Sequence, residues 1–174
     1  MIIQRASDRP GVPWRNGLGV QYEITADGPL PDGWGWRLST ADITTNVAFS
    51  SFPGVDRFFC VGTGNGVVLT IDGVDHRCEP RSVTHHQIHR PHRPIDQGRE
   101  DLGISPEVRD GASHRGYHVA VAGATVTAVS VVALEGGAVV RHAGDVHDLG
   151  DLDAVICQRA TTFDVVSGAV VVVS

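Results

Sequence analysis

Three segments of the chain follow one pattern: a valine-rich run, a short turn that contains glycine, and a second apolar run. The turns fall at Asn65-Gly66, Gly136-Gly137 and Ser167-Gly168. Valine fits the pleated, half-buried surface of a sheet, and glycine tolerates the positive φ of a tight turn. The pattern therefore predicts a β-hairpin at each place. Runs with helical spacing are nearly absent, so we expect an all-β protein with antiparallel strands.

The length of 174 residues allows one well-packed domain, or two small halves that share a core. The recurring hairpins favour a single domain over residues 1–174 made of two β halves, although no strict repeat supports them. The C-terminal run AVVVVS is too short to cross a bilayer and predicts a buried final strand. The N-terminus has neither a signal peptide nor a membrane span, so we expect no membrane partner.

Charge and cysteine content exclude several classes of function. The net charge is −6 and no basic run is coupled to aromatic residues, which argues against a nucleic-acid partner. All 14 positively charged side chains are arginine, so Schiff-base catalysis, pyridoxal phosphate attachment and a Walker-type phosphate loop are excluded. The 3 cysteines match no zinc template, and Cys60 and Cys157 lie in apolar runs typical of inert thiols. A reduced, cytoplasmic protein is the simplest interpretation.

The segment from Trp34 to Arg57 is the densest in chemically useful side chains. Residues 36–43 alternate with a period of two, which predicts a strand with Trp36 on one face and Arg37 and Ser39 on the other. The small Ser39 leaves room beside Arg37 for a bound molecule. A Pro-Gly turn and then Arg57 follow this strand. We expect the segment to form much of the wall of a site.

Three arginines, Arg15, Arg37 and Arg57, lie next to an aromatic residue or a tight turn. A guanidinium group is suited to bidentate capture of a carboxylate. Two interpretations stay open. The arginines form internal pairs that fix the fold, with Glu23 as the nearest partner, or they line a pocket for a small carboxylate-bearing molecule.

Aromatic side chains of the same segments predict the apolar wall of that pocket. No catalytic residue is predicted, because no nucleophile elbow or distinctive pair of carboxylates occurs. The predicted ligand-binding residues are Trp14, Arg15, Asn16, Glu23, Trp36, Arg37, Ser39, Phe52 and Arg57.

Residues 80–116 break the strand pattern and are rich in His, Arg, Pro and Asp. Composition favours a long loop or a disordered insertion here, although a strand pair hidden in the stretch would be hard to see. Four histidines, His85, His86, His89 and His92, crowd into this region. Without a His-x-His pair we predict no metal site. The alternative is a metal-dependent cupin enzyme, an isomerase or dioxygenase, that uses His85, His86 or His89.

Over residues 1–75 the chain resembles the HutD/Ves family. The matching motifs are Trp14-Arg15-Asn16-Gly17-Leu18-Gly19, Glu23-Ile24, Trp36-Arg37-Leu38-Ser39-Thr40-Ala41 and Phe49-Ser50-Ser51-Phe52-Pro53-Gly54-Val55-Asp56-Arg57. They occur in the family's order and spacing. The Phe-x-Gly-Asp and Asp-Phe/Leu-Asn-Val-Met elements of the family are missing from residues 80–116, where Glu100-Asp101-Leu102-Gly103 is the nearest counterpart.

The resemblance implies a cupin-type (RmlC-like) β-barrel or sandwich, described as a bicupin, in bacterial cytoplasm. It also implies a non-catalytic ligand-binding protein without a cofactor, a regulator or sensor linked to histidine utilisation. The implied ligand is a small anionic metabolite such as urocanate or a formylated or formiminated glutamate. The oligomeric state, with a homodimer as one option, stays open.

Overall fold

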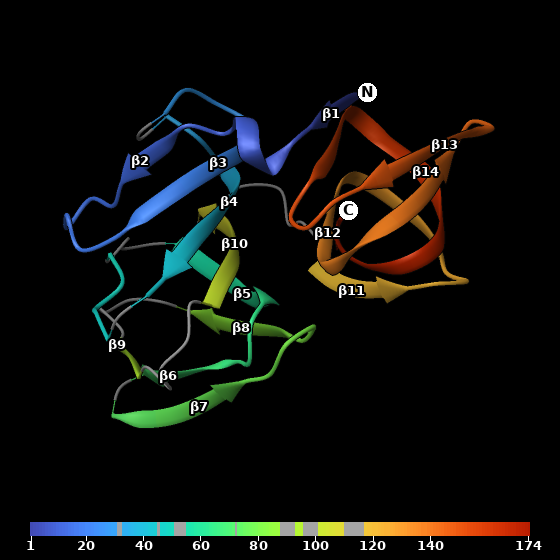
Figure 1. Ribbon diagram of the computed structural model, residues 1–174. Coiled ribbons are helices and arrows are strands. Elements are labelled where there is room, and N and C mark those ends of the chain that lie inside the picture. Colours follow the sequence, from blue (N-terminus) through green and yellow to red (C-terminus); the bar gives the residue numbers. More distant parts are fainter. Residues whose placement is uncertain are drawn as a thin grey trace. The chain divides into compact units, whose positions relative to one another are not determined.

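A computed structural model of the chain describes residues 1–30, 33–44, 46–50, 55–71, 73–87, 93–95, 101–109 and 117–174. For residues 84–87, 93–95 and 101–109 the description covers the backbone. The chain divides into two compact units, one of Met1–Arg9 with Arg115–Ser174 and one of Pro10–His114. We call them unit 1 and unit 2. Strands build both units, as Figure 1 shows.

Unit 2 contains two sheets. The larger has six strands in the order β2-β3-β4-β10-β5-β8, and the smaller has three in the order β7-β6-β9. In the larger sheet the bounds are Gly11–Pro13 for β2, Val20–Ala26 for β3, Trp36–Ile43 for β4, Asp101–Arg109 for β10, Val55–Thr63 for β5 and Val83–Gln87 for β8. In the smaller sheet they are Val74–Cys78 for β7, Val67–Ile71 for β6 and Arg93–Ile95 for β9.

The core of unit 2 is formed by side chains from both sheets and from the connecting segments that hold Trp14 and Phe49. Phe49 packs edge-on against Trp14, with ring centroids 5.4 Å apart, and lies 5.9 Å from the ring of Phe59. The cluster contains Trp14, Ile43, Phe49, Phe59, Val61, Val67, Leu69 and Cys78.

Unit 1 is built around two unusually long strands. These are β12 (Thr125–His142) and β14 (Ala154–Val173), with β1 (Ile2–Gln4) and β11 (Tyr117–Val121) beside β14 and β13 (Asp145–Leu149) beside β12. A short 3-10 helix, η1, covers Ala6–Asp8. Residue numbers in β14 fall as those in β12 rise, for example Thr125 opposite Asp164 and Ala128 opposite Thr161, which is the register of antiparallel pairing.

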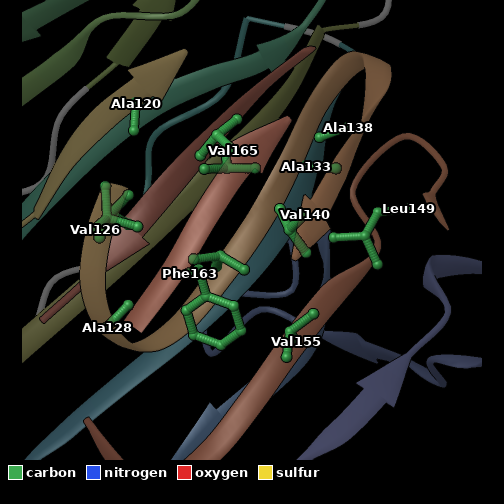
Figure 2. Packing of buried hydrophobic residues seen from close by; sticks show 13 residues of the cluster. Ala120, Val126, Ala128, Ala133, Ala138, Val140, Leu149, Val155, Phe163 and Val165 are labelled. Atoms are coloured by element: carbon green, nitrogen blue, oxygen red, sulfur yellow. The ribbon is translucent and has the colours of Figure 1, made fainter. Parts of the chain in front are cut away.

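β12 and β14 curl around a common interior (Figure 1). The middle of β12 pairs with both ends of β14, since Val131 lies opposite Val155 on one side and Val172 on the other. Figure 2 shows Val126, Val140 and Phe163 pointing into this interior. The buried members of the cluster are Ala120, Val126, Ala128, Val131, Ala133, Ala138, Val140, Leu149, Val155, Phe163, Val165, Val170 and Val172.

The predicted hairpins at Gly136-Gly137 and Ser167-Gly168 are wrong, because β12 and β14 continue through these residues. The glycines bend the strands without ending them. Gly168 has a φ of 76°, and a Cβ there would lie 2.2 Å from the carbonyl oxygen of Gly137. Only glycine permits both this backbone conformation and this close approach of two strands.

The predicted turn at Asn65-Gly66 exists, but it does not form a hairpin. It connects β5 of the larger sheet of unit 2 to β6 of the smaller one. The connection that follows β6 does join paired strands, because Ile71 at the end of β6 lies opposite Val74 of β7. Asp72, within that turn, lies outside the described residues.

Residues 80–116 hold three strands, β8, β9 and β10, where composition favoured a loop. The loop prediction is therefore wrong for the described part of this stretch. The reason is most visible in β10, where the sequence DLGISPEVR contains Pro106. Proline lacks an N–H group for the ladder and normally argues against a central strand, yet β10 lies between β4 and β5.

The all-β prediction is confirmed, and so is the buried final strand, since Val170–Val173 are fully buried at the end of β14. No helix among the described residues is long and apolar enough to span a membrane. The assignment of residues 1–174 to a single domain stays a prediction.

Candidate functional site

The candidate site begins on β4, whose side chains alternate as the sequence predicted. Arg37 and Ser39 are buried, with 4% and 3% of their surface exposed. They share a face with Ala41 and Ile43, which pack into or against the core of unit 2. Two polar side chains are therefore held at one end of a face whose other end is apolar.

Arg57 on β5 is the second buried guanidinium group of unit 2, with 6% of its surface exposed. It alternates in phase with Phe59 and Val61 of the core cluster. Its Cζ atom lies 5.6 Å from the centre of the Phe49 ring, and its Nη2 donates to the carbonyl oxygen of Ser50 at 3.5 Å. Both contacts come from the loop that precedes β5, and they orient the planar side chain.

Arg37 has a comparable aromatic neighbour. Its Cζ atom lies 4.9 Å from the centre of the Trp34 ring, and Trp34 is only 2% exposed. A guanidinium group over an indole ring is a favourable cation–π arrangement. Both arginines of the site are thus packed against rings.

The register of the larger sheet brings the two arginines together. β10 lies between β4 and β5, and Glu107 of β10 is directly opposite Arg37 on one side and Arg57 on the other. Directly opposite residues share a face of the sheet. The row across β3, β4, β10, β5 and β8 reads Ala26, Arg37, Glu107, Arg57 and His86.

Glu23 belongs to the neighbouring row on the same face. It is half-buried on β3 and lies directly opposite Ser39, just before a bulge between Glu23 and Thr25. Since Ser39 follows Arg37 by two residues, Glu23 is diagonal to Arg37. The structure therefore brings four of the predicted site residues onto one face: Glu23, Arg37, Ser39 and Arg57.

Asn16 holds the turn that follows Trp14. Its side-chain amide donates to the carbonyl oxygen of Ala48 at 2.8 Å, and its side-chain oxygen accepts the N–H of Leu18 at 3.1 Å. Its backbone N–H donates to the hydroxyl of Ser50 at 3.3 Å. In this structure the amide of Asn16 is engaged in fastening the turn to residues 48–50.

The remaining predicted site residues lie in different settings. Trp14 is part of the core of unit 2, and Arg15 is exposed. Trp36 is buried, but it alternates with Arg37 and so faces the other side of β4. Phe52 lies outside the described residues.

Glu107 is the residue of this row that sequence analysis missed. Its stretch looked like a loop because Pro106 and polar residues dilute the strand pattern. The available signal was the period-two spacing of Leu102, Ile104 and Val108, which places Glu107 between apolar positions.

The histidine cluster is only partly described. His85 and His86 are neighbours on β8, opposite Phe58 and Arg57, so they alternate between the faces of the sheet. His89 and His92 lie outside the described residues. In the part of the chain that the structure describes, no group of at least three His, Cys, Asp or Glu side chains is arranged to hold a metal ion.

The cysteines fit the expectation of inert thiols. Burial raises the pKa of Cys60 to about 12, with a further contribution from nearby Cys78. Burial also raises the pKa of Cys157. Thiols with raised pKa values stay protonated near neutral pH and are poor nucleophiles.

Unit 1 has its own polar cluster around Asp153. The carboxylate accepts from Arg5 at 2.6 Å and from the backbone N–H groups of Ala6 and Gly150 at 2.8 and 2.9 Å. Burial opposes ionisation of this carboxyl group, but these hydrogen bonds outweigh it and lower the pKa of Asp153. Within unit 1, the cluster fastens residues 5–6 to residues 150–153.

Arg9 adds to the same fastening. Its guanidinium group donates to the carbonyl oxygen of Leu152 at 2.6 Å and to the side chain of Gln4 at 2.7 Å. Burial lowers the pKa of Arg9 to about 10. Both of these partners, Leu152 and Gln4, belong to unit 1, which is typical of a structural role.

A shallow hollow of about 240 Å³ on unit 1 is a weaker candidate for a ligand site. It is smaller than ordinary ligand pockets. Within it, the hydroxyl of Thr125 donates to the carboxylate of Asp164 at 2.7 Å, and Arg141 is opposite Asp164 in the register of β12 and β14. The hollow is lined by Gly123, Ala124, Thr125, Arg141, Asp164, Val165 and Val166.

Comparison with known proteins gives one family and several related structures. The HutD family model matches residues 6–172. An uncharacterised 21.2 kDa protein from the hutC 3′ region of Pseudomonas putida is 49% identical over 72 residues, which are 41% of this chain and 38% of that protein. Protein Ves of Citrobacter koseri is 43% identical over 56 residues, 32% of this chain and 29% of Ves. The aligned parts thus span less than half of these relatives.

Solved structures cover much more of the chain. HutD from Pseudomonas fluorescens, determined in a formate condition, has a TM-score of 0.81 and 26% identity, covering 99% of this chain and 97% of HutD. A conserved protein of unknown function from Pseudomonas aeruginosa has a TM-score of 0.83 at 22% identity, covering 99% and 98%. A cupin 2 barrel protein from Leptotrichia buccalis has a TM-score of 0.57 at 10% identity, covering 94% and 92%. The predicted cupin-type fold is therefore confirmed.

Proposed function

Because the chain belongs to the HutD family, we propose that it is a non-catalytic cupin that binds a small anionic metabolite in the cytoplasm. The proposed ligand class is urocanate or a formylated or formiminated glutamate. The proposed output is regulation or sensing linked to histidine utilisation. The name of the Pseudomonas putida relative, which places it in the hutC 3′ region, supports that link.

The observation that carries the proposal is the pair Arg37 and Arg57. Both guanidinium groups are buried, lie on the same face of one sheet and are separated by the single strand β10. A guanidinium group is the side chain best suited to bind a carboxylate through two parallel hydrogen bonds. A metabolite with one or two carboxylates is the ligand that such a pair recognises.

Ser39 and Glu23 extend the face next to Arg37. The Ser39 hydroxyl can donate to an anion or accept from an amide, and Glu23 accepts from N–H groups such as those of an imidazole or a formimino group. This mixture suits a ligand that carries nitrogen as well as carboxylate. Urocanate and formiminated glutamate both do.

The proposal assigns no catalytic group to the face. The role that the proposal gives to Arg37 and Arg57 is to bind and orient an anion through hydrogen bonds. The thiol of Cys60, which is also on β5, is held protonated by burial, which raises its pKa to about 12.

A thermal-shift panel tests the proposal. Urocanate, formylated glutamate, formiminated glutamate and formate are each added to the wild-type protein, to Arg37→Ala and to Arg77→Ala. Arg77 is the matched control because it lies on β7 with 61% of its side chain exposed, next to the exposed Glu79. We expect at least one compound to raise the Tm of the wild type and of Arg77→Ala, with little effect on Arg37→Ala. A panel without any shift, or an equal shift in Arg37→Ala, contradicts the proposal.

A further inference from the structure

The hollow on unit 1 contains a positive and a negative side chain in one row of the sheet. Asp164 of β14 is directly opposite Thr125 at the start of β12 and directly opposite Arg141 near its end. Directly opposite residues share a face of the sheet, with Cβ atoms about 4.5–5.5 Å apart. All three residues line the hollow. They form one row, with Asp164 between the hydroxyl and the guanidinium group.

This row lies on the outer face of the strands. Each of its three residues is next in the chain to a side chain that points into the core of unit 1 (Figure 2). These neighbours are Val126, Val140 and Phe163. Because side chains alternate along a strand, the row itself points outward. Asp164 is half-buried, whereas Thr125 and Arg141 are exposed. A small solute can therefore reach all three side chains.

Both charged groups of the row have room for a further hydrogen-bond partner. The hydroxyl of Thr125 donates to Oδ1 of Asp164 at 2.7 Å and so orients the carboxylate. Within the described part of the chain, Oδ2 of Asp164 accepts no hydrogen bond, and the guanidinium group of Arg141 makes neither a hydrogen bond nor an ion pair. One acceptor oxygen and the donors of one guanidinium group thus remain for a ligand.

Backbone hydrogen bonds hold the wall of the hollow in place. The N–H of Gly123 donates to the carbonyl oxygen of Val165 at 2.8 Å, and the N–H of Val165 donates to the carbonyl oxygen of Ala124 at 2.8 Å. Beside Gly123 the space is open, since nothing lies within 4 Å of the position that a Cβ atom would take. The wall is preformed, so binding requires little further ordering of the protein.

The volume of the hollow limits the ligand to a small molecule. It measures about 240 Å³, which is the liquid volume of about eight water molecules. A molecule of about six to eight non-hydrogen atoms occupies a similar space. The row carries one positive and one negative charge, so a ligand that also carries one of each matches it without leaving a charge unpaired.

We propose that the hollow binds a free α-amino acid with a small apolar side chain, such as alanine or valine. The carboxylate of the amino acid accepts hydrogen bonds from Arg141, and its ammonium group donates to Oδ2 of Asp164. The side chain of the amino acid lies against the apolar part of the wall, which includes Ala124 and Val166. This site belongs to unit 1 and goes beyond the proposed function, which concerns the arginine pair of unit 2.

Amide NMR during titration of the wild-type protein with L-alanine and L-valine tests the proposal. We expect saturable shifts of the resonances of residues 123–125 and 164–166. Two blocked compounds are the controls. N-acetyl-L-alanine keeps the carboxylate but lacks the ammonium group, and L-alanine amide keeps the ammonium group but lacks the carboxylate. We expect each blocked compound to bind at least about tenfold more weakly than L-alanine.

Two variants remove the charges of the row one at a time. We expect Arg141→Ala and Asp164→Asn each to bind L-alanine at least about tenfold more weakly than the wild type. Arg159→Ala is the matched control for the first, because Arg159 is an exposed arginine of β14 outside the lining of the hollow. Asp145→Asn, at an exposed position on β13, is the control for the second. Both controls should bind as the wild type does.

The proposal is overturned when neither amino acid shifts these resonances, or when the shifts are confined to unit 2. It is also overturned when a blocked compound binds as tightly as L-alanine, or when either site variant binds L-alanine as tightly as the wild type. The blocked compounds are measured on the wild-type protein, so they can contradict the proposal even when a site variant does not fold.

Discussion

Arg37 and Arg57 lie on different strands, yet both stand directly opposite the same residue of β10. With one strand between them, their backbones are about 10 Å apart. Both side chains are buried and each packs against an aromatic ring, Trp34 for Arg37 and Phe49 for Arg57. The two positive charges are thus held in a fixed geometry, which is the property that an anion site requires.

Replacing Arg57 by lysine tests whether the shape of the group matters as well as its charge. Lysine keeps the positive charge but lacks the planar fork that binds a carboxylate through two hydrogen bonds. We expect Arg57→Lys to bind the metabolite about tenfold more weakly than the wild type in calorimetric titration. Arg77→Lys on exposed β7 is the control. Unchanged affinity in Arg57→Lys would show that the fork makes no contact with the ligand.

Gly168 is expected to tolerate no side chain. Its φ of 76° is unfavourable for other residues, and a Cβ would lie 2.2 Å from the carbonyl oxygen of Gly137. We expect Gly168→Ala to lower the free energy of unfolding by about 2–4 kcal/mol, measured by urea denaturation. Gly123→Ala separates the two causes, because Gly123 has a φ of 90° but open space around the Cβ position. Its cost should be about 1 kcal/mol, and equal costs would contradict the close approach of β12 and β14.

Asp153 is expected to make the stability of the protein depend on acid pH. Its pKa is lowered in the folded state despite burial, by Arg5 and two backbone N–H groups. The stabilisation is therefore complete above the ordinary carboxyl pKa of about 4 and is lost as the pH falls through the lowered value. Near neutral pH we expect Asp153→Asn to cost about 1–3 kcal/mol.

Urea denaturation at a series of pH values measures this difference. The gap between the wild type and Asp153→Asn should narrow once the pH falls below about 4. Asp145→Asn, an exposed position on β13, serves as the control and should change stability little. A gap that stays constant down to acid-induced unfolding would contradict the assignment.

Replacing Asn16 by alanine tests whether this residue has a structural role or contacts the ligand. Its amide donates to Ala48 and its side-chain oxygen accepts from Leu18. We expect Asn16→Ala to lower the free energy of unfolding by about 1 kcal/mol because these hydrogen bonds are partly exposed. The affinity for the metabolite should change less than about twofold. A large loss of affinity with unchanged stability would instead place Asn16 in contact with the ligand.

The strand that carries Arg37 could be predicted from sequence because its pattern is undisturbed. Residues 36–43 alternate without a glycine or proline, and the burial of Arg37 and Ser39 on one face follows from that period. The burial of the valine-rich end of β14 could also be predicted from sequence. In these segments the type of each residue, apolar or polar, indicates which face of the strand it occupies.

Glu107 and the course of β12 and β14 could not be predicted, for two physical reasons. Pro106 has no N–H group for the ladder, yet β10 pairs with both β4 and β5. Gly137 and Gly168 lie in sequences typical of turns, but pairing between β12 and β14 keeps both residues inside continuous strands. Pairing with distant residues decides both cases, and the period-two spacing of Leu102, Ile104 and Val108 is too short a local signal to predict it.

The most direct test of the account is a calorimetric titration of urocanate, formylated glutamate and formiminated glutamate into the wild type, Arg37→Ala and Arg57→Ala, with Arg77→Ala as the control. The account predicts that at least one compound binds the wild type and Arg77→Ala with equal affinity. It also predicts that each of the two site variants binds that compound at least about tenfold more weakly. Binding that is unchanged in both site variants, or absent from the wild type, would contradict it.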